Sequence, residues 1–188
     1  MNERKLLFMM KPEQLMAFLR LQQDAEAGDG VAACRLGDMY REALDGLRYS
    51  PKEAYRWYAR SAMAGDPNGQ NNLGACYEHG LGCVQSYPKA VKWYRLAAAQ
   101  GLAYASSNLG YSTLRGHGVE MDKSEALAWF ERALKQGDDR AQEMVEQLVG
   151  TMPPRRNVRI VDETEPGKHF GLVGVAGVAP QDQDAPGE

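Results

Sequence analysis

Aromatic, apolar and glycine positions return along this chain at a fixed interval. Tryptophan stands at Trp57, Trp93 and Trp129, two steps of 36 residues, and each is followed at once by a second aromatic residue. Glycines keep the same interval, and Leu-Gly pairs recur at steps of 37 and 36 residues. Three markers that share one period predict an array of structural repeats. The second aromatic residues are Tyr58, Tyr94 and Phe130, the glycines are Gly65, Gly101 and Gly137, and the pairs are Leu36-Gly37, Leu73-Gly74 and Leu109-Gly110.

Within each unit the spacing predicts two helices. In the first helix Leu36 and Tyr40 stand four residues apart, as Leu73 and Tyr77 do in the next unit, so each pair shares one helix face. A glycine inside a helix costs about 1 kcal/mol relative to alanine. The glycine that recurs after this leucine therefore indicates that the facing helix approaches closely there.

The second helix of each unit begins at a repeated N-cap, which is Ser50, Ser86 or Asp122. Ser50 is followed by Pro51, which suits the first helical position, and by Glu53, which would complete a capping box. Small and aromatic residues then follow at helical spacing until a glycine ends the helix. We expect the core between the helices to contain Leu36, Gly37, Tyr40, Trp57, Tyr58, Leu73, Gly74, Tyr77, Trp93, Tyr94, Leu109, Gly110, Trp129 and Phe130.

Incomplete units flank the three complete ones. The segment before them has a helical pattern without the aromatic pair, and the segment after them begins like a first helix in which Glu146 replaces the glycine. Terminal units of this kind cap repeat arrays. From Met152 the periodicity ends, which favours a flexible tail, although the strand-like runs NVRIV and GLVGVAGV leave open that the tail docks on its own groove or on a partner. The expected organisation is a capping helix in 1–29, repeats at 30–65, 66–101 and 102–137, a capping helix in 138–150 and a tail in 151–188.

The order of these residue types resembles the Sel-1-like repeat, a relative of the tetratricopeptide repeat. The second unit carries the pattern best, from LGACYEHGLG through KAVKWYRLAAAQG, and the third follows with GHGVEMDKSEALAWFERALKQG. The first unit departs in its loop, EALDGLRYS, which is one residue longer and lacks Gly-x-Gly. The resemblance covers about residues 30–149. It implies an all-α fold, a right-handed superhelix or solenoid of antiparallel helix pairs whose first helices line a concave groove.

The groove implied by this resemblance is polar and rich in amides. Asn71, Asn72 and Asn108 stand out, because asparagine is a poor helix former and needs another reason to be there. In such grooves asparagines commonly bind the backbone of an extended peptide; the alternative is that they hydrogen-bond neighbouring helices. The predicted groove residues are Arg35, Asp38, Arg41, Asn71, Asn72, Glu78, Ser107, Asn108 and Tyr111.

Composition and charge mainly exclude functions. The chain has 188 residues and a formal charge of −3, so it lacks a large basic surface for nucleic acid. No stretch approaches the roughly 18–20 apolar residues that span a bilayer, and the apolar run Leu6–Met10 is too short for a secretory signal, so we expect a cytoplasmic protein. The cysteines, Cys34, Cys76 and Cys83, form no CxxC pair, and we expect no disulfide framework, metal or cofactor.

These observations favour a non-enzymatic scaffold or adaptor that binds a protein or peptide in the groove. Two alternatives remain. Ser86 and Lys89 have the S-x-x-K spacing of penicillin-recognising enzymes, which would make the chain a β-lactam-binding or hydrolytic protein, but no S-D-N or K-T-G element accompanies them. Cysteine-rich relatives linked to β-lactam chemistry carry a pair of cysteines in each repeat. In this chain the position expected to hold the second cysteine, opposite Cys76, is Ala98. The second alternative is a structural homo-oligomer.

Overall fold

The structure is a computed structural model that describes residues 11–151 of the chain. In this range the backbone forms eight α-helices, one short 3₁₀-helix and no strand. The expectations for the apolar run near the N-terminus and for the tail lie outside the described residues. The elements are α2 (Pro12–Glu26), α3 (Gly30–Glu42), η1 (Leu44–Gly46), α4 (Pro51–Met63), α5 (Pro67–His79), α6 (Tyr87–Ala99), α7 (Ala103–Arg115), α8 (Lys123–Lys135) and α9 (Ala141–Thr151).

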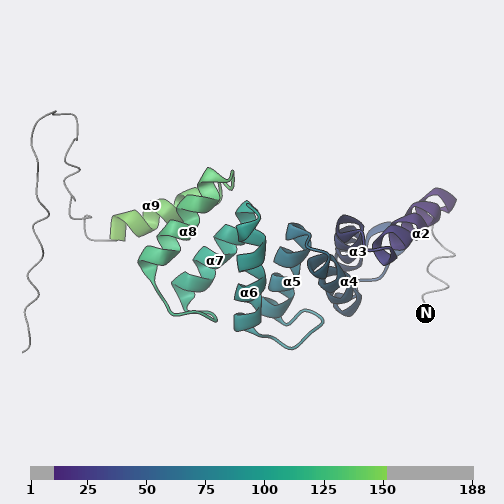
Figure 1. Cartoon of the computed structure of the whole chain (residues 1–188), viewed down its shortest axis with the longest axis horizontal. Helices are drawn as coiled ribbons and strands as arrows, with labels where there is room; N and C mark the ends of the chain where they lie inside the picture. Colours follow the sequence, from purple (N-terminus) through teal and green to yellow (C-terminus); the bar gives the residue numbers. More distant parts are fainter. Residues whose placement is uncertain (1–10, 152–188) are drawn as a thin grey trace, which may run out of the picture. The chain divides into compact units, whose positions relative to one another are not determined.

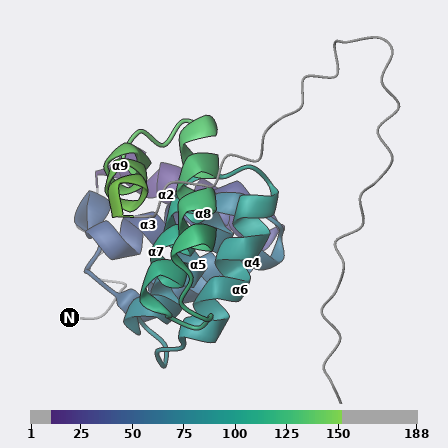
Figure 2. The ribbon, with the colours of Figure 1, turned by 90° about the vertical axis from the view of Figure 1, so that its left-hand side faces the viewer.

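The helices follow one another as antiparallel pairs along the array (Figure 1). The tightest packing joins α3 to α4, α5 to α6 and α7 to α8, and these pairs are the three repeats. Each second helix then packs on the first helix of the next repeat, while α2 covers α3 and α9 covers α8. Seen nearly along the stack, the first helices α3, α7 and α9 lie to one side and the second helices α4 and α6 to the other (Figure 2). The fold is therefore the all-α solenoid that the sequence predicted.

The second helices begin at the predicted caps, but the three caps differ in their hydrogen bonds. Ser50 Oγ accepts the N–H of Glu53 (3.3 Å), and Asp122 Oδ1 accepts two N–H groups of the first turn of α8 (2.7 and 3.0 Å). Ser86 also precedes its helix, yet its hydroxyl accepts no hydrogen bond of this kind. The Glu53 carboxylate, which was expected to complete a capping box, pairs with Arg56 (2.7 Å).

The glycine of each Leu-Gly pair lies under an aromatic ring of the partner helix. A Cβ atom built on any of these glycines would come closer than 3.0 Å to a ring carbon, which side chains in proteins do not tolerate. The three rings are 0–1% exposed and are the largest fully buried side chains. The close approach inferred from the glycine is thus a contact with one ring. The contacts are Gly37 with Tyr58, Gly74 with Tyr94 and Gly110 with Phe130.

The three tryptophans lie at the margin of the core, which differs from the expectation that they fill it. Trp57, Trp93 and Trp129 are only partly buried. The guanidinium of Arg60 lies 4.9 Å from the ring centroid of Trp57, and that of Arg132 lies 5.4 Å from Trp129. Successive side chains on a helix point about 100° apart, so only one of two adjacent aromatic residues can face the first helix. Of the other predicted core residues, Leu36, Tyr40, Leu73 and Leu109 are buried and Tyr77 is partly buried.

Each Gly-x-Gly loop connects the two helices of one repeat and packs against the preceding repeat. Gly82 and Gly118, the second glycine of each loop, have φ of +73° and +76°. A Cβ atom there would come closer than 3.0 Å to backbone atoms of Pro51 and Tyr87, which start the second helix of the preceding repeat. The first repeat lacks this motif, and its loop forms η1 instead. There Asp45 Oδ1 accepts a hydrogen bond from Gln14 Nε2 on α2 (3.0 Å).

Candidate functional site

A chain of hydrogen bonds crosses the first helices of the three repeats. Asn108 Nδ2 donates to Asn71 Oδ1 (2.8 Å), Asn71 Nδ2 donates to Asn72 Oδ1 (3.5 Å), and Asn72 Nδ2 donates to Asp38 Oδ1 (3.5 Å). The Tyr58 hydroxyl on α4 donates to the same oxygen of Asp38 (2.8 Å). We call the four side chains of α3, α5 and α7 in this chain the amide ladder; they are Asp38, Asn72, Asn71 and Asn108.

The amide ladder explains why asparagine occurs inside these helices. Its bonds from Asn108 to Asn71 and from Asn72 to Asp38 each join two neighbouring first helices, which is one of the two interpretations considered from the sequence. All four side chains are partly buried and partly exposed. A primary amide carries two N–H donors and an oxygen with two lone pairs, so the bonds within the ladder use only part of its capacity.

The charged groove residues flank the ladder. Arg35 and Arg41 are exposed, and Arg41 Nη2 lies 3.3 Å from Asp38 Oδ1. Glu78 Oε2 accepts the hydroxyl of Tyr94 (2.6 Å). Burial, followed by this hydrogen bond, raises the pKa of Tyr94 well above the ordinary tyrosine value, so the hydroxyl stays a donor.

Of the two remaining predicted groove residues, Ser107 is buried and Tyr111 is partly exposed. Ser107 is only 4% exposed, and its hydroxyl donates to Asp138 Oδ2 (2.6 Å), so it serves the packing of α7 and cannot meet a partner. This corrects the expectation for Ser107, whose helical position was counted from the core pattern alone. Tyr111 is partly exposed and packs edge-on against Phe130, with ring centroids 4.9 Å apart.

Sequence reasoning missed an exposed aromatic residue on the same surface. Tyr104 is 52% exposed, and the guanidinium of Arg140 lies 4.2 Å from its ring centroid. Tyr104 stands four residues before Asn108 and seven before Tyr111, so it shares their helix face. That spacing was the signal that could have identified it.

Ser86 and Lys89 are not joined as a nucleophile and its base. No hydrogen bond within the described part of the chain links the two side chains. The Lys89 ammonium instead lies 5.2 Å from the ring centroid of Tyr77, a cation–π contact with the first helix of the same repeat.

The cysteines are free thiols. Cys34 and Cys76 are buried, and burial raises the pKa of each to about 12, so they remain protonated at neutral pH. The Cys83 thiol donates to the carbonyl oxygen of Cys76 (3.4 Å). Over residues 11–151 no group of three or more histidine, cysteine and acidic side chains is arranged to hold a metal, and no helix is long and apolar enough to cross a membrane.

Comparison with known proteins gives three matches to the Sel1 repeat family model, at residues 30–66, 67–102 and 103–138. Among solved structures, a Sel1 repeat protein from Oxalobacter formigenes is 34% identical, with a TM-score of 0.66, and the match covers 74% of this chain and 56% of that one. The c5321 protein, a protective antigen of uropathogenic Escherichia coli strains with an SLR fold, is 36% identical, with a TM-score of 0.63, over 68% of this chain. The present chain spans only 27% of c5321.

A third structure shows the fold alone. The cysteine-rich protein B of Helicobacter pylori is 23% identical, with a TM-score of 0.53, over 66% of this chain and 94% of that one. No curated protein sequence matches the chain.

Proposed function

Because the chain belongs to the Sel1 repeat family, whose members are generally non-enzymatic scaffolds for protein–protein interaction, we propose that it binds an extended peptide or partner protein on the first-helix surface. This surface consists of the exposed faces of α3, α5 and α7. The observation that carries the proposal is the amide ladder, which runs across all three helices.

The ladder supports this proposal because its side chains are held in place before a partner arrives. An extended peptide presents backbone N–H and C=O groups that must exchange water for protein partners. Side chains that already share hydrogen bonds lose less conformational entropy when they bind such groups. The amide groups that the ladder leaves unused supply both donors and acceptors.

Specificity would come from the residues around the ladder. Arg35 offers positive charge at the α3 end, and Glu78 offers negative charge on α5. Arg41 is held between Asp38 (3.3 Å) and Glu42 (2.7 Å), and an acidic group of a partner would compete with these carboxylates for it. At the α7 end, Tyr104 and Tyr111 offer aromatic surface, which binding interfaces favour. A partner that fits would place an acidic group near α3 and an apolar group near α7.

An affinity experiment with matched charge variants tests the proposal. Immobilised wild-type chain captures partners from a lysate of the source organism, mass spectrometry identifies them, and calorimetry with the purified partner gives its affinity. Asn71→Arg/Asn108→Arg adds two bulky charges to the ladder and should weaken binding at least tenfold. Ala99→Arg/Ala128→Arg adds the same charge at exposed positions of the second helices and should bind as the wild type does.

Circular dichroism and thermal melting first establish that both variants fold. Equal affinity of all three proteins for the same partner would place the interface elsewhere and reject the proposal. Capture of the chain alone, together with light scattering that shows oligomers, would favour the homo-oligomer instead.

A further inference from the structure

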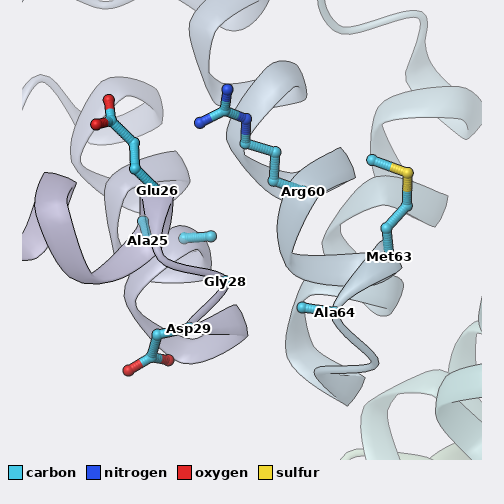
Figure 3. Close-up of a pocket in the computed structure, with 8 residues that line it drawn as sticks. Ala25, Glu26, Gly28, Asp29, Arg60, Met63 and Ala64 are labelled. Carbon is cyan, nitrogen blue, oxygen red and sulfur yellow. The ribbon is translucent and has the colours of Figure 1, made fainter.

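A pocket of about 450 Å³ opens between the turn that joins α2 to α3 and the end of α4 (Figure 3). Its walls include Ala33 and Ala64, and the carboxylate of Glu26 and the guanidinium of Arg60 come from opposite sides of the opening. The pocket shares no residue with the first-helix surface described above, so it does not depend on the proposed function.

The corresponding place in the later repeats is filled by a pair of polar side chains. In the second repeat Gln100 Nε2 donates to the carbonyl oxygen of Gly65 (3.0 Å) and to Gln70 Oε1 (2.9 Å). In the third repeat Ser106 Oγ donates to Gln136 Oε1 (2.7 Å). These pairs connect the end of a second helix to the first helix of the same repeat, and Gln100 also reaches the turn before that first helix.

The first repeat has alanine at both positions of this pair. Ala64 stands one repeat before Gln100, and Ala33 stands one repeat before Gln70. A first-helix member without its partner would be a buried polar group that lacks this bond, which costs about 1–3 kcal/mol, whereas alanine at both positions avoids that cost and leaves space. The counterpart of the Gly65 carbonyl is the carbonyl of Gly28, to which no donor is bonded within residues 11–151.

We propose that this pocket binds the side chain of a glutamine presented by a partner protein. Gln100 shows that a carboxamide on two methylene groups fits the equivalent space and donates to the glycine carbonyl. An entering carboxamide would donate to the Gly28 carbonyl in the same way. Its own oxygen would accept a hydrogen bond from Arg60, whose counterpart Arg132 extends from α8 to the end of α6 and donates there to the carbonyl oxygen of Ala98 (2.7 Å).

The charges around the pocket favour a neutral group. Glu26 and Arg60 at the opening have opposite signs, so neither a carboxylate nor an ammonium would meet only attraction there. The third charged residue of the lining, Asp29, already accepts the N–H groups of Val31 and Ala32 (2.8 and 3.0 Å). A purely apolar side chain would leave the carbonyl of Gly28 without a donor. A carboxamide satisfies the carbonyl and the guanidinium together.

Nuclear magnetic resonance on the full chain tests the proposal with blocked amino acids as probes. N-acetyl-glutamine methylamide should shift the backbone amide signals of Gly28, Gly30, Ala33 and Ala64 in a saturable way. The equivalent derivatives of norleucine and glutamate should bind about tenfold more weakly, since each loses a hydrogen bond or gains an unbalanced charge.

Filling the pocket provides the decisive variant. Ala33→Ser/Ala64→Gln rebuilds the pair of the third repeat and should abolish the shifts while the chain folds normally. If the double variant does not fold, Ala64→Gln alone, at an exposed position, should also block the pocket. Ala27→Gln is the matched control, because it places the same side chain at the equivalent, exposed end of α2.

The glutamine derivative should bind Ala27→Gln and Asn71→Arg/Asn108→Arg as it binds the wild type. Absence of saturable shifts, equal binding by the filled variant, or preference for norleucine or glutamate would each overturn the proposal. Failure of the first-helix surface to bind a peptide would leave these outcomes unchanged.

Discussion

The buried aromatic residue of each repeat and its acidic hydrogen-bond partner differ together between repeats. The buried tyrosine of the first repeat donates to Asp38, and that of the second donates to Glu78. In the third repeat Phe130 takes the tyrosine's place and has no hydroxyl, and the two acidic positions are occupied by Tyr111 and Leu114. A buried tyrosine hydroxyl therefore occurs where a carboxylate can accept its hydrogen bond, and in the third repeat both groups are missing. This pattern fits the high cost of leaving one member of a buried pair without the other.

Tyr94→Phe tests this coupling. We expect the variant to lose about 1–2 kcal/mol in the free energy of unfolding, because Glu78 Oε2 loses its donor. Tyr94→Phe/Glu78→Leu copies the third repeat and should recover most of that loss. Urea denaturation measures both, with Tyr49→Phe at an exposed position as the control. The coupling would be contradicted if the double variant lost as much free energy of unfolding as the two single variants together, or more.

Gly74→Ala probes the contact between glycine and ring. Alanine is the better helix former by about 1 kcal/mol, yet its Cβ atom would lie 2.6 Å from the Tyr94 ring, so we expect a net loss of about 1–3 kcal/mol. Gly150→Ala is the control, because a Cβ atom there has nothing within 4 Å and should leave stability unchanged or raised. Similar urea midpoints for both variants would mean that the ring moves aside freely.

At the scale of the helix, the sequence predicted the elements well and their facing sides less well. Helix starts such as Ser50 and Asp122 depend on local hydrogen bonds, and the repeat interval depends on residue types, so both can be read from one chain. Which of two adjacent aromatic residues faces inward depends on how the helix is rotated against its partner, so Trp57 was placed too deep. Ser107 was placed too far out because its partner, Asp138, comes from the next turn.

Asp138 shows how one side chain holds the turn before α9 against α7. It is 2% exposed and accepts hydrogen bonds from Arg140 in its own turn and from Ser107 on α7. The bond from Arg140 lowers its pKa below the ordinary value of 3.8. The carboxylate therefore stabilises the folded chain above about pH 4, and this contribution is lost as the pH falls through the folded-state pKa.

Asp138→Asn should reduce the melting temperature at pH 7, since a charged hydrogen bond contributes about 1.5–3 kcal/mol. The difference from the wild type should narrow as the pH falls below about 4, because the wild type then loses the same charge. Thermal melts of both proteins from pH 7 to pH 3 measure this difference in melting temperature. Asp139→Asn, the exposed neighbour, is the control and should show no such trend. A difference that stays constant with pH would reject the role of the carboxylate.

At the scale of the whole array, stability depends on contacts between neighbouring repeats. The loop glycines Gly82 and Gly118 lie against the backbone of the preceding repeat, and only glycine fits there. These contacts were not predictable from periodicity, because they depend on the angle between successive helix pairs. Helix α9 shows the reverse case, because Glu146 stands where the first helices of the repeats have the glycine that contacts an aromatic ring.

Gly118→Ala and Gly116→Ala separate this contact from backbone strain. Both positions have positive φ, so each alanine costs about 1–2 kcal/mol of strain. A Cβ atom at Gly116 meets its nearest neighbour at 3.4 Å, whereas one at Gly118 would lie 2.5 Å from the carbonyl carbon of Tyr87. We expect Gly118→Ala to lose about 1–3 kcal/mol more than Gly116→Ala in urea denaturation. Equal losses would show that the repeats are not held together at this loop.

The tryptophans at the margin of the core give each repeat its own fluorescent reporter. The chain contains three tryptophans, and they stand at the same place in three successive second helices. Replacing any two with phenylalanine leaves a single emitter whose spectrum follows one repeat. In repeat arrays unfolding can begin at one end and spread, and a single melting curve averages over such steps. Three single-tryptophan chains would therefore resolve the order in which this array comes apart.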